Sequence, residues 1–212
     1  MKGFLKVDYE PKLNDPVYVI GVSGVGAVGR VSARLLVEWA KAKPFSAYYS
    51  PHFPDQAFIQ EDGTCSLPRW EFYESRSCSP NLLVAVGGSR ILAEEPEAYY
   101  GVLEEILELG LKLGARRIAV LDGVAALSNQ LEEVYVVATS KGLVDGLVDV
   151  GGKPLRSSRL PGDMGPLLGL ARLKGLEAFG ILKPSRSLVL DREAGGSAFK
   201  FLVKALGLRK RD

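Results

Sequence analysis

A strand that is apolar on both faces runs directly into a glycine-rich turn and a helix, and this junction limits the folds open to the chain. Residues 17–22 (VYVIGV) are apolar throughout, as expected for a strand buried in the middle of a sheet. Gly24-x-Gly26-x-x-Gly29 follows, and apolar residues then recur at helical spacing as far as Trp39. A strand, a tight turn and a helix in this order predict a parallel α/β fold.

The same alternation of strands and helices continues along most of the chain. The first helix is expected to run from Val25 to Lys43, where Pro44 ends it, and a short strand is expected at residues 45–50. Further strands are predicted at residues 82–86, 117–121, 134–138 and 178–182, and further helices at residues 97–113, 143–147, 162–175 and 195–207. We therefore predict a three-layer α/β domain around a mostly parallel sheet.

An antiparallel hairpin is predicted as an insertion in this domain. Residues 57–60 and 69–74 would form its two strands, with Asp62-Gly63 as the turn between them. Residues 1–16 are polar and irregular, and residues 208–212 read as a basic tail. The expected organisation is an N-terminal extension (1–16), a single α/β domain (17–207) and a C-terminal tail (208–212).

The composition argues against several classes of function. Among 212 residues, 27 basic and 25 acidic side chains leave a net charge of +2, too balanced to favour nucleic-acid or membrane binding. We also expect no transmembrane helix and no signal peptide, because every apolar run is short. Two cysteines without a Cys-x-x-Cys pair suit the reducing cytoplasm. A single histidine argues against a metal site, and we expect none.

The glycine pattern matches the dinucleotide-binding fingerprint only in part. That fingerprint needs an acidic residue at the end of the second strand, where it would bind a ribose hydroxyl. Ser50 and Pro51 occupy this place, so we expect neither NAD nor another cofactor. The free amides at the start of the helix remain an alternative site for an anion. The other interpretation is that the glycines allow a sharp turn and close packing of the helix.

Ser23 lies in a sequence that resembles the nucleophile elbow of serine hydrolases. That motif is Gly-x-Ser-x-Gly at a strand-to-helix turn, and here Val25 replaces the last glycine. The catalytic histidine of such an enzyme follows late in the chain, whereas no histidine follows His52. We therefore interpret Ser23 as the N-cap of the helix.

Polar residues follow the ends of four predicted strands. Because parallel strands share one carboxyl edge, these residues would lie together and could hold a small polar or anionic molecule. The candidate pocket comprises Ser23, Gly24, Gly26, Gly29, Ser89, Arg90, Asp122 and Ser140. The alternative is that serine, aspartate and glycine are simply the residues that tight turns use.

An aromatic-rich segment begins after the second strand. His52 and Phe53 lie between two prolines, in a stretch that cannot be helical. The predicted hairpin then carries aromatic side chains on both faces, one of which would be wet in a monomer. We interpret this segment as an oligomer or partner surface formed by His52, Phe53, Phe58, Trp70, Phe72 and Tyr73. The alternative is packing within the domain.

Taken in order, these features resemble the archaeal proteasome-assembly-chaperone family, which is related to the second of the eukaryotic proteasome assembly chaperones. The resemblance covers residues 17–207 and depends on the order and spacing of several segments. These segments are GVSGVGAVGRVSARLL, HFPDQAF, EDGTCSLPRWEFY, LLVAVGGSR, YYGVLEEILELGLKLGARRIAVLDG, EVYVVAT and GPLLGLARLKGLEAFGIL.

The resemblance implies a phosphorylase/hydrolase-like α/β fold, homo-oligomers, no enzymatic activity and, for some members, binding to the proteasome α-ring. Members that dock on the proteasome often end in a hydrophobic residue, a tyrosine and any third residue. This sequence ends Lys210-Arg211-Asp212 instead. The family's usual acidic-Gln-Pro after the third strand is also replaced, by Gly88-Ser89-Arg90.

We therefore expect a non-enzymatic assembly chaperone or adaptor that acts as a homo-oligomer in the cytoplasm. Its expected partners are copies of itself and proteasome α-subunits or a related client. The alternative is an enzyme or sensor that binds a nucleotide or nucleoside at the strand ends, through the Gly24–Gly29 turn, Ser89 and Asp122.

Overall fold

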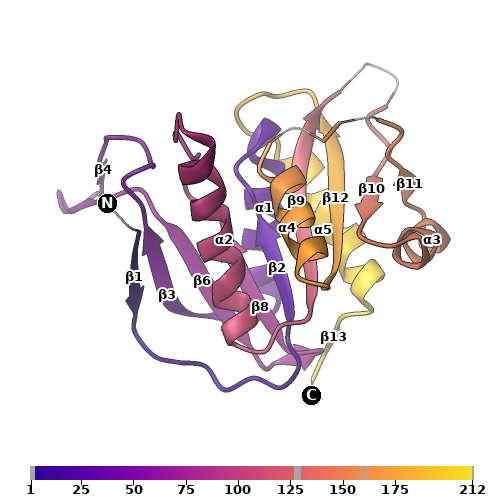
Figure 1. Cartoon of the computed structure of the whole chain (residues 1–212), viewed down its shortest axis with the longest axis horizontal. Helices are drawn as coiled ribbons and strands as arrows, with labels where there is room; N and C mark the ends of the chain where they lie inside the picture. The colour runs from indigo at the N-terminus through magenta and orange to yellow at the C-terminus, as the bar shows by residue number, and fades with distance from the viewer. Residues whose placement is uncertain (1–2, 127–129, 158, 161, 212) are drawn as a thin grey trace.

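The computed structural model describes residues 3–126, 130–157, 159–160 and 162–211. The strands of its main sheet are β1 (Phe4–Val7), β2 (Val17–Gly21), β3 (Lys43–Tyr49), β6 (Trp70–Ser75), β8 (Leu82–Val86), β9 (Arg117–Ala125), β10 (Tyr135–Ala138), β11 (Lys153–Pro154) and β12 (Glu177–Ser185). Across the sheet they are arranged in the order β1-β3-β6-β8-β2-β9-β12-β10-β11 (Figure 1). The helices are α1 (Val28–Trp39), α2 (Pro96–Lys112), α3 (Lys141–Asp149), α4 (Met164–Leu173) and α5 (Arg192–Leu206).

Four neighbouring strands in the middle of the sheet, β8, β2, β9 and β12, are parallel. They are apolar and almost wholly buried, as strands covered by helices on both faces must be. On one side β6, β3 and β1 continue the sheet in antiparallel pairs, and on the other side β10 is antiparallel to β12. The predicted α/β class is confirmed, and the sheet is mixed with a parallel centre.

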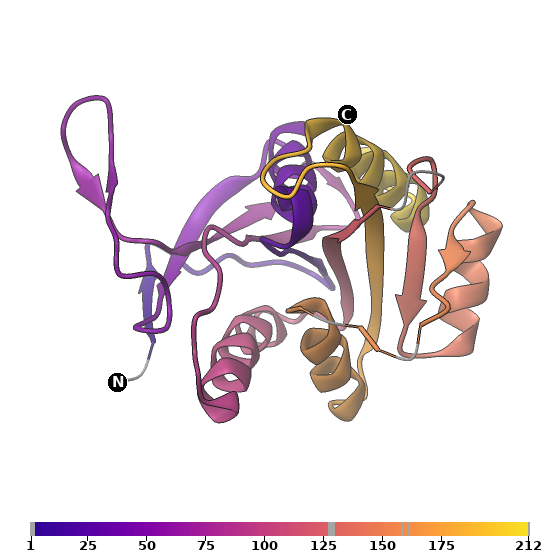
Figure 2. The ribbon, with the colours of Figure 1, turned by 90° about the horizontal axis from the view of Figure 1, so that it is seen from above.

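Two helices cover each face of the sheet, which gives three layers (Figure 2). α1 and α5 pack on one face, where Val19 and Leu121 point, and α2 and α4 pack on the other, where Ile20 and Val120 point. The sheet therefore separates two apolar cores. α3 lies at the edge, beside β10 and β11 (Figure 1). No helix in the described part of the chain is long and apolar enough to cross a membrane.

The first helix is shorter than the sequence predicted. A 3-10 turn, η1 (Val25–Ala27), precedes α1, and Ala27 adopts a left-handed conformation between the two. The chain leaves the helix at Lys41, which has a positive φ of 48°, and β3 has already begun when it reaches Pro44. Pro44 therefore lies in a strand and does not itself end the helix.

The predicted hairpin is only half correct. Its first strand and its turn exist, because β4 (Phe58–Ile59) is followed by Gly63 with φ of +81°. The second strand is β5 (Cys65–Ser66) instead of residues 69–74. Residues 70–75 form β6, an interior strand of the main sheet between β3 and β8. The aromatic residues of β6 were assigned to a surface hairpin because their burial depends on neighbours far along the chain.

Both ends of the chain pair with the body of the protein. Residues 4–7 were expected to be irregular, but they form β1, which is antiparallel to β3. Near the C-terminus, β13 (Arg209–Lys210) pairs with β7 (Cys78–Ser79), and the ammonium of Lys210 lies 5.4 Å from the centre of the Trp39 ring. The basic segment after α5 is therefore held against the fold.

Substituting two glycines of α2 distinguishes the effect of helix propensity on stability from the effect of packing. A Cβ at Gly110 would overlap the ring of Tyr18 in β2, whereas one at Gly101 would meet open space. We expect Gly110→Ala to destabilise the fold by about 1–3 kcal/mol through overpacking. Gly101→Ala is the matched control and should stabilise it by up to about 1 kcal/mol, because alanine favours the helix. Urea unfolding measures both effects, and effects of the same sign would contradict this packing of α2 on β2.

Candidate functional site

The carboxyl ends of the four parallel strands surround a cavity of about 1110 Å³, which we call the strand-end cavity. This edge of the sheet is uppermost in Figure 1. Five residues of the predicted pocket line the cavity, namely Ser23, Gly24, Ser89, Arg90 and Asp122. They come from the turns after β2 and β8 and from β9 just beyond its pairing with β2, so the parallel centre of the sheet brings them together.

Three predicted pocket residues lie elsewhere. Ser140 caps the N-terminus of α3, where its hydroxyl accepts a hydrogen bond from the amide of Leu143 (3.4 Å). It is not at the cavity because β10 is antiparallel to β12, so the end of β10 lies at the opposite edge of the sheet. Gly26 and Gly29 are not among the lining residues, because they are packed beneath the turn. For these three residues the predicted place in the pocket is wrong.

The glycines of the β2–α1 turn are packed against the chain itself. A Cβ at Gly29 would overlap the carbonyl oxygen of Leu121, and one at Gly24 would overlap the carboxylate of Asp122. Gly26 has φ of +63°, which favours glycine, and a Cβ there would overlap the hydroxyl of Ser185. The turn is thus filled by β9 and β12, which favours the packing interpretation of these glycines over a pyrophosphate site.

Ser23 does not cap a helix, so this prediction was wrong. Its hydroxyl donates to the carbonyl oxygen of Gly87, at the end of β8. Neither η1 nor α1 has a side-chain cap at its start. The hydroxyl of Ser23 therefore ties two neighbouring strand ends together at the wall of the strand-end cavity.

Asp122 is the buried charge of the strand-end cavity. Its side chain is 5% exposed, and Oδ1 accepts a hydrogen bond from the amide of Gly123 (2.7 Å). Burial raises the pKa of Asp122 to about 7, helped by the negative charge of Asp163 and opposed by the Gly123 amide. A carboxyl group with this pKa changes its charge near neutral pH. Because Asp122 lines the cavity, the charge of the cavity changes with it.

Asp163, just before α4, forms a second acidic group close to Asp122. Its Oδ1 accepts a hydrogen bond from the hydroxyl of Tyr99 in α2 (2.6 Å). Burial raises the pKa of Asp163, while the Tyr99 hydrogen bond and the positive charge of Arg90 oppose the rise. No group of three or more His, Cys, Asp or Glu side chains within the described ranges is arranged to hold a metal ion.

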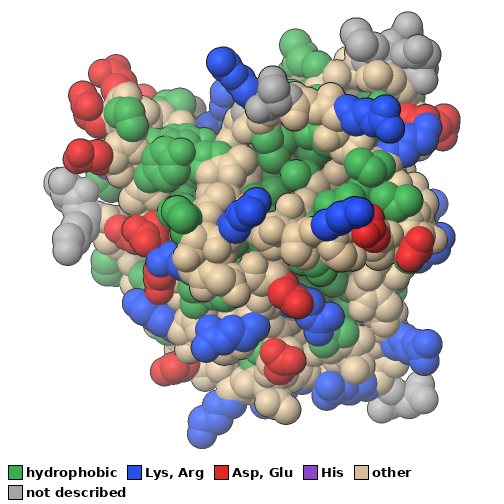
Figure 3. Space-filling view, turned by 45° about the vertical axis from the view of Figure 1, so that its right-hand side comes forward, with side chains coloured by type: hydrophobic (Ala, Val, Ile, Leu, Met, Phe, Trp, Pro, Cys, Tyr) green, Lys and Arg blue, Asp and Glu red, His purple; other side chains and the backbone are tan. Residues whose placement is uncertain are grey.

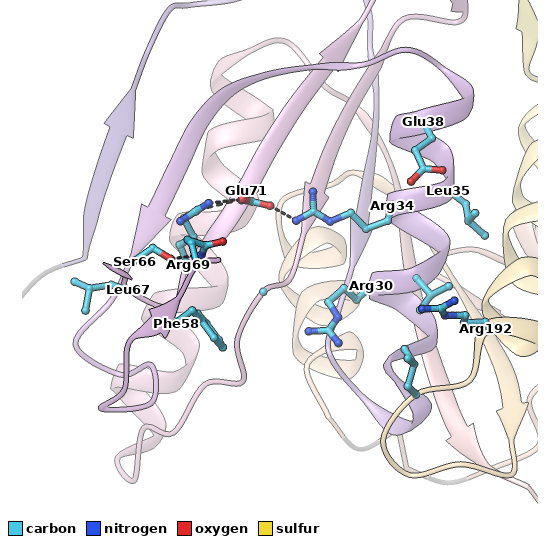
Figure 4. Close-up of a pocket in the computed structure, with 14 residues that line it drawn as sticks. Arg30, Arg34, Leu35, Glu38, Phe58, Ser66, Leu67, Arg69, Glu71 and Arg192 are labelled. Carbon is cyan, nitrogen blue, oxygen red and sulfur yellow. Dashed lines mark hydrogen bonds and ion pairs between the residues drawn. The ribbon is translucent and has the colours of Figure 1, made fainter. Parts of the chain in front are cut away.

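A second hollow of about 650 Å³ adjoins the first and is shown in Figure 4. It lies between α1 and the β4–β5 hairpin, and we call it the hairpin groove. At its floor Glu71 pairs with Arg34 of α1 and with Arg69, whose Nη2 lies 2.8 Å from Glu71 Oε1. Burial would raise the pKa of Glu71, but the two guanidinium groups hold it below its usual value.

Two further arginines make the hairpin groove positive. Arg30 extends from α1 toward the hairpin, and Arg192 lies on the far side of α1 (Figure 4). Neither has an ion-pair partner among the residues that the structure describes, while Arg34 and Arg69 share the single carboxylate of Glu71. The groove therefore has an excess of positive charge, and Arg30 lines both hollows.

Most of the aromatic residues predicted for a partner surface belong to the core. Phe53, Trp70, Phe72 and Tyr73 are buried, so their assignment to an exposed surface was wrong. Trp70 and Phe72 of β6 point into one core and Tyr73 into the other, and Phe53 packs edge-to-face on the core residue Tyr48. Only Phe58 (45% exposed) remains at the surface, and His52 is half-buried in the loop before the hairpin.

Seven exposed apolar residues lie at or next to the two hollows, and we call this set the apolar rim. The rim consists of Phe58, Ile59 and Leu67 on the hairpin, Leu92 after β8, and Leu188, Val189 and Leu190 between β12 and α5. Figure 3 shows hydrophobic side chains around hollows in the upper part of the molecule, with basic side chains between them. Sequence reasoning missed the rim, although the apolar run SLVL (187–190) outside any predicted element was a signal for it.

The fold and this edge define a three-layer α/β protein whose mixed sheet carries two hollows inside an apolar rim. Its family follows from comparison with known proteins. The PAC2 family matches residues 18–210, so the chain belongs to the PAC2 family. The resemblance to archaeal proteasome assembly chaperones is thereby confirmed.

Three relatives illustrate the likeness. PbaB of Pyrococcus furiosus, an archaeal proteasome activator, is 26% identical with a TM-score of 0.88, over 99% of this chain and 91% of PbaB. PbaA of the same organism, an archaeal homolog of proteasome-assembly chaperone, is 23% identical with a TM-score of 0.78, over 99% of this chain and 88% of PbaA. The uncharacterized protein MJ1210 of Methanocaldococcus jannaschii is 29% identical over 207 residues, 93% of this chain and 76% of that protein.

The raised pKa of Asp122 predicts how stability depends on pH. Folded Asp122 keeps its proton to a higher pH than the unfolded chain, so the free energy of unfolding falls as pH rises from about 4 to about 7. Asp122→Asn removes this dependence and can retain the bond from Gly123. We expect the variant to be more stable than the wild type at pH 8, by about 2–4 kcal/mol, with the difference shrinking toward pH 4.

Urea unfolding at pH 4.5 and pH 8 tests this prediction. Asp145→Asn, at an exposed position of α3, is the matched control and should change the free energy of unfolding by less than about 0.5 kcal/mol at both pH values. A loss of stability in Asp122→Asn that is equal at both pH values would contradict the assignment of Asp122 as a desolvated carboxyl group.

Proposed function

We propose that this PAC2 protein is a non-enzymatic chaperone-like protein or adaptor that works as a homo-oligomer and docks on proteasome α-subunits or a related client. The single observation that carries the proposal is the apolar rim. Leu188 and Val189 are 76% and 81% exposed, and with the hairpin residues they form one apolar edge around two hollows. Grouped exposed apolar side chains are typical of protein–protein interaction sites.

The hairpin groove supports a docking role through its charge. Arg30 and Arg192 have no ion-pair partner among the described residues, and apolar Phe58 and Leu67 form the opposite wall. A client segment with carboxylates and apolar side chains would complement both. Complementary charge speeds association and selects the partner, while the apolar contacts supply affinity.

The polar groups at the strand ends favour a protein without enzymatic activity. Ser23 donates to a backbone carbonyl, so its hydroxyl lacks the general base that a nucleophile needs. The backbone carbonyl oxygen of His52 accepts a hydrogen bond from the amide of Leu92 (2.7 Å). Its ring does not line the strand-end cavity, so it is not placed to activate Ser23.

The edge strand β1 supports self-association. β1 ends the main sheet, so its outer backbone groups have no strand beside them among the described elements. All four of its residues are exposed, including Phe4 and Val7. An uncovered apolar edge strand is a template for pairing with a second chain.

Static light scattering tests the oligomer. We expect a mass that is a multiple of the 22.9 kDa chain at micromolar concentration. Val7→Pro removes an edge amide and should lower the mass if β1 forms the contact between copies. A wild-type protein that stays at 22.9 kDa would contradict a homo-oligomer, whatever the variant does.

Binding to purified proteasome α-subunits tests the docking surface. The double variants Ile59→Ser/Leu67→Ser and Leu188→Ser/Val189→Ser should each weaken binding at least about tenfold, because each removes two exposed apolar side chains of the rim. Stability should change by less than about 0.5 kcal/mol, because all four side chains are exposed.

Leu173→Ser is the matched control for this experiment. Leu173 is 85% exposed, but it ends α4 at the opposite edge of the sheet, so its replacement should leave binding unchanged. Equal losses in the control and the rim variants would point to non-specific adhesion. A wild-type protein that binds no α-subunit would remove the proteasome from the proposal.

A further inference from the structure

The strand-end cavity has the size and composition of a small-molecule site. Its volume of about 1110 Å³ is at the upper end for pockets that enclose a ligand. Its walls are largely apolar, with Val124, Leu155, Leu160 and Leu182 among the lining residues. It lies outside the carboxyl ends of parallel strands, where open α/β sheets usually bind their ligands. The docking proposal makes no use of this interior.

Asp122 gives the cavity a hydrogen-bond acceptor that has one partner, the Gly123 amide, among the described residues. The Gly123 amide occupies one position on Oδ1, and within the described chain no donor reaches Oδ2. Asp122 is one of the residues that line the cavity, although only 5% of its surface is exposed. A carboxylate in apolar surroundings is stabilised by N–H or O–H donors, which a ligand can supply.

Three arginines, Arg30, Arg90 and Arg159, line the cavity and give it positive charge. Arg30 comes from the first turn of α1 and Arg90 from the loop after β8. No ion pair within 4.0 Å is formed by either guanidinium in the parts of the chain that the structure describes. Guanidinium groups bind the oxygens of phosphate in pairs, so these two side chains suit a phosphorylated ligand.

We propose that the strand-end cavity binds a nucleoside monophosphate, with base or ribose donors on Asp122 and the phosphate on Arg30 and Arg90. This class joins N–H and O–H donors, a flat apolar ring and one phosphate group within a single molecule of suitable size. The mode differs from that of dinucleotide-binding folds. There the phosphate lies at the helix N-terminus, a place that Asp122 and Ser185 fill here beside Gly24 and Gly26.

The nucleotide site lies directly beneath the docking surface. Phe58, Leu188 and Val189 belong to the apolar rim and also line the strand-end cavity, and Arg30 lines both hollows. A bound nucleotide would therefore change the affinity of the rim for its client. Only this coupling rests on the proposed function, because nucleotide binding itself is measured without any client.

Isothermal titration calorimetry on the full chain at pH 8 tests the site with AMP, GMP, CMP and UMP. Adenosine, guanosine and inorganic phosphate are measured alongside as partial ligands. We expect at least one monophosphate to bind, and its nucleoside and free phosphate to bind at least about tenfold more weakly. The absence of binding by all four monophosphates up to about 1 mM would overturn the proposal.

Three variants locate the bound nucleotide. Asp122→Asn should weaken nucleotide binding about tenfold without weakening phosphate binding, because it removes an acceptor and a negative charge. Arg90→Ala should weaken both, and its exposed side chain can be truncated without loss of the fold if Asp122→Asn fails to fold. Arg192→Ala is the matched control, since Arg192 lines the hairpin groove and not the cavity, and it should bind nucleotide as the wild type does.

Two results would contradict the assignment even if binding is seen. Nucleotide binding that survives both Asp122→Asn and Arg90→Ala would place the ligand elsewhere. Phosphate that binds as tightly as every nucleotide would reduce the site to a simple anion site. Neither result would affect the docking proposal, whose measurement uses rim variants and proteasome α-subunits.

Discussion

The upper edge of the molecule depends on one close contact, the start of α1 against the ends of β2 and β9. Gly21, Gly29 and Gly123 lie at this contact, and a Cβ on any of them would overlap backbone atoms of the neighbouring segment. Because α1 lies directly on the strand ends, the glycine turn is filled by the protein. The same approach places Gly24 on the carboxylate of Asp122, which is buried as a result, and burial raises its pKa.

The two hollows at this edge shift the pKa of a buried carboxyl group in opposite directions. Glu71 is flanked by Arg34 and Arg69, so its pKa lies below the usual value despite burial. The pKa of Asp122 lies above its usual value, because burial and the negative charge of Asp163 outweigh the hydrogen bond from the Gly123 amide. In the hairpin groove the charge of Glu71 is therefore already neutralised by Arg34 and Arg69. Arg30 and Arg192 are the basic side chains that remain to bind a partner. In the strand-end cavity the buried carboxyl group has a raised pKa, which is typical of functional sites.

Local sequence patterns predicted the helices and strands better than they predicted which strands are neighbours in the sheet. The strands at β2, β8, β9 and β12 were foreseen, because continuous apolar runs indicate buried parallel strands. Trp70 and Phe72 were misplaced, since an aromatic strand looks the same on a surface hairpin as in a sheet interior. The pocket residues Ser23, Ser89 and Asp122 were found because parallel topology fixes where strands end. Ser140 was misassigned, because the reversal of β10 leaves no local signal.

By itself the sequence determined the α/β rhythm, the glycine turn and the family, since these depend on residues close together in the chain. Tertiary structure alone decided which aromatics are buried, that Leu188 and Val189 line the same cavity as Phe58, and that Arg30 lines two hollows. The physical reason is that burial and exposed patches are set by contacts between segments far apart in sequence. The order of strands in the sheet, β3-β6-β8-β2-β9, is what brings those segments together.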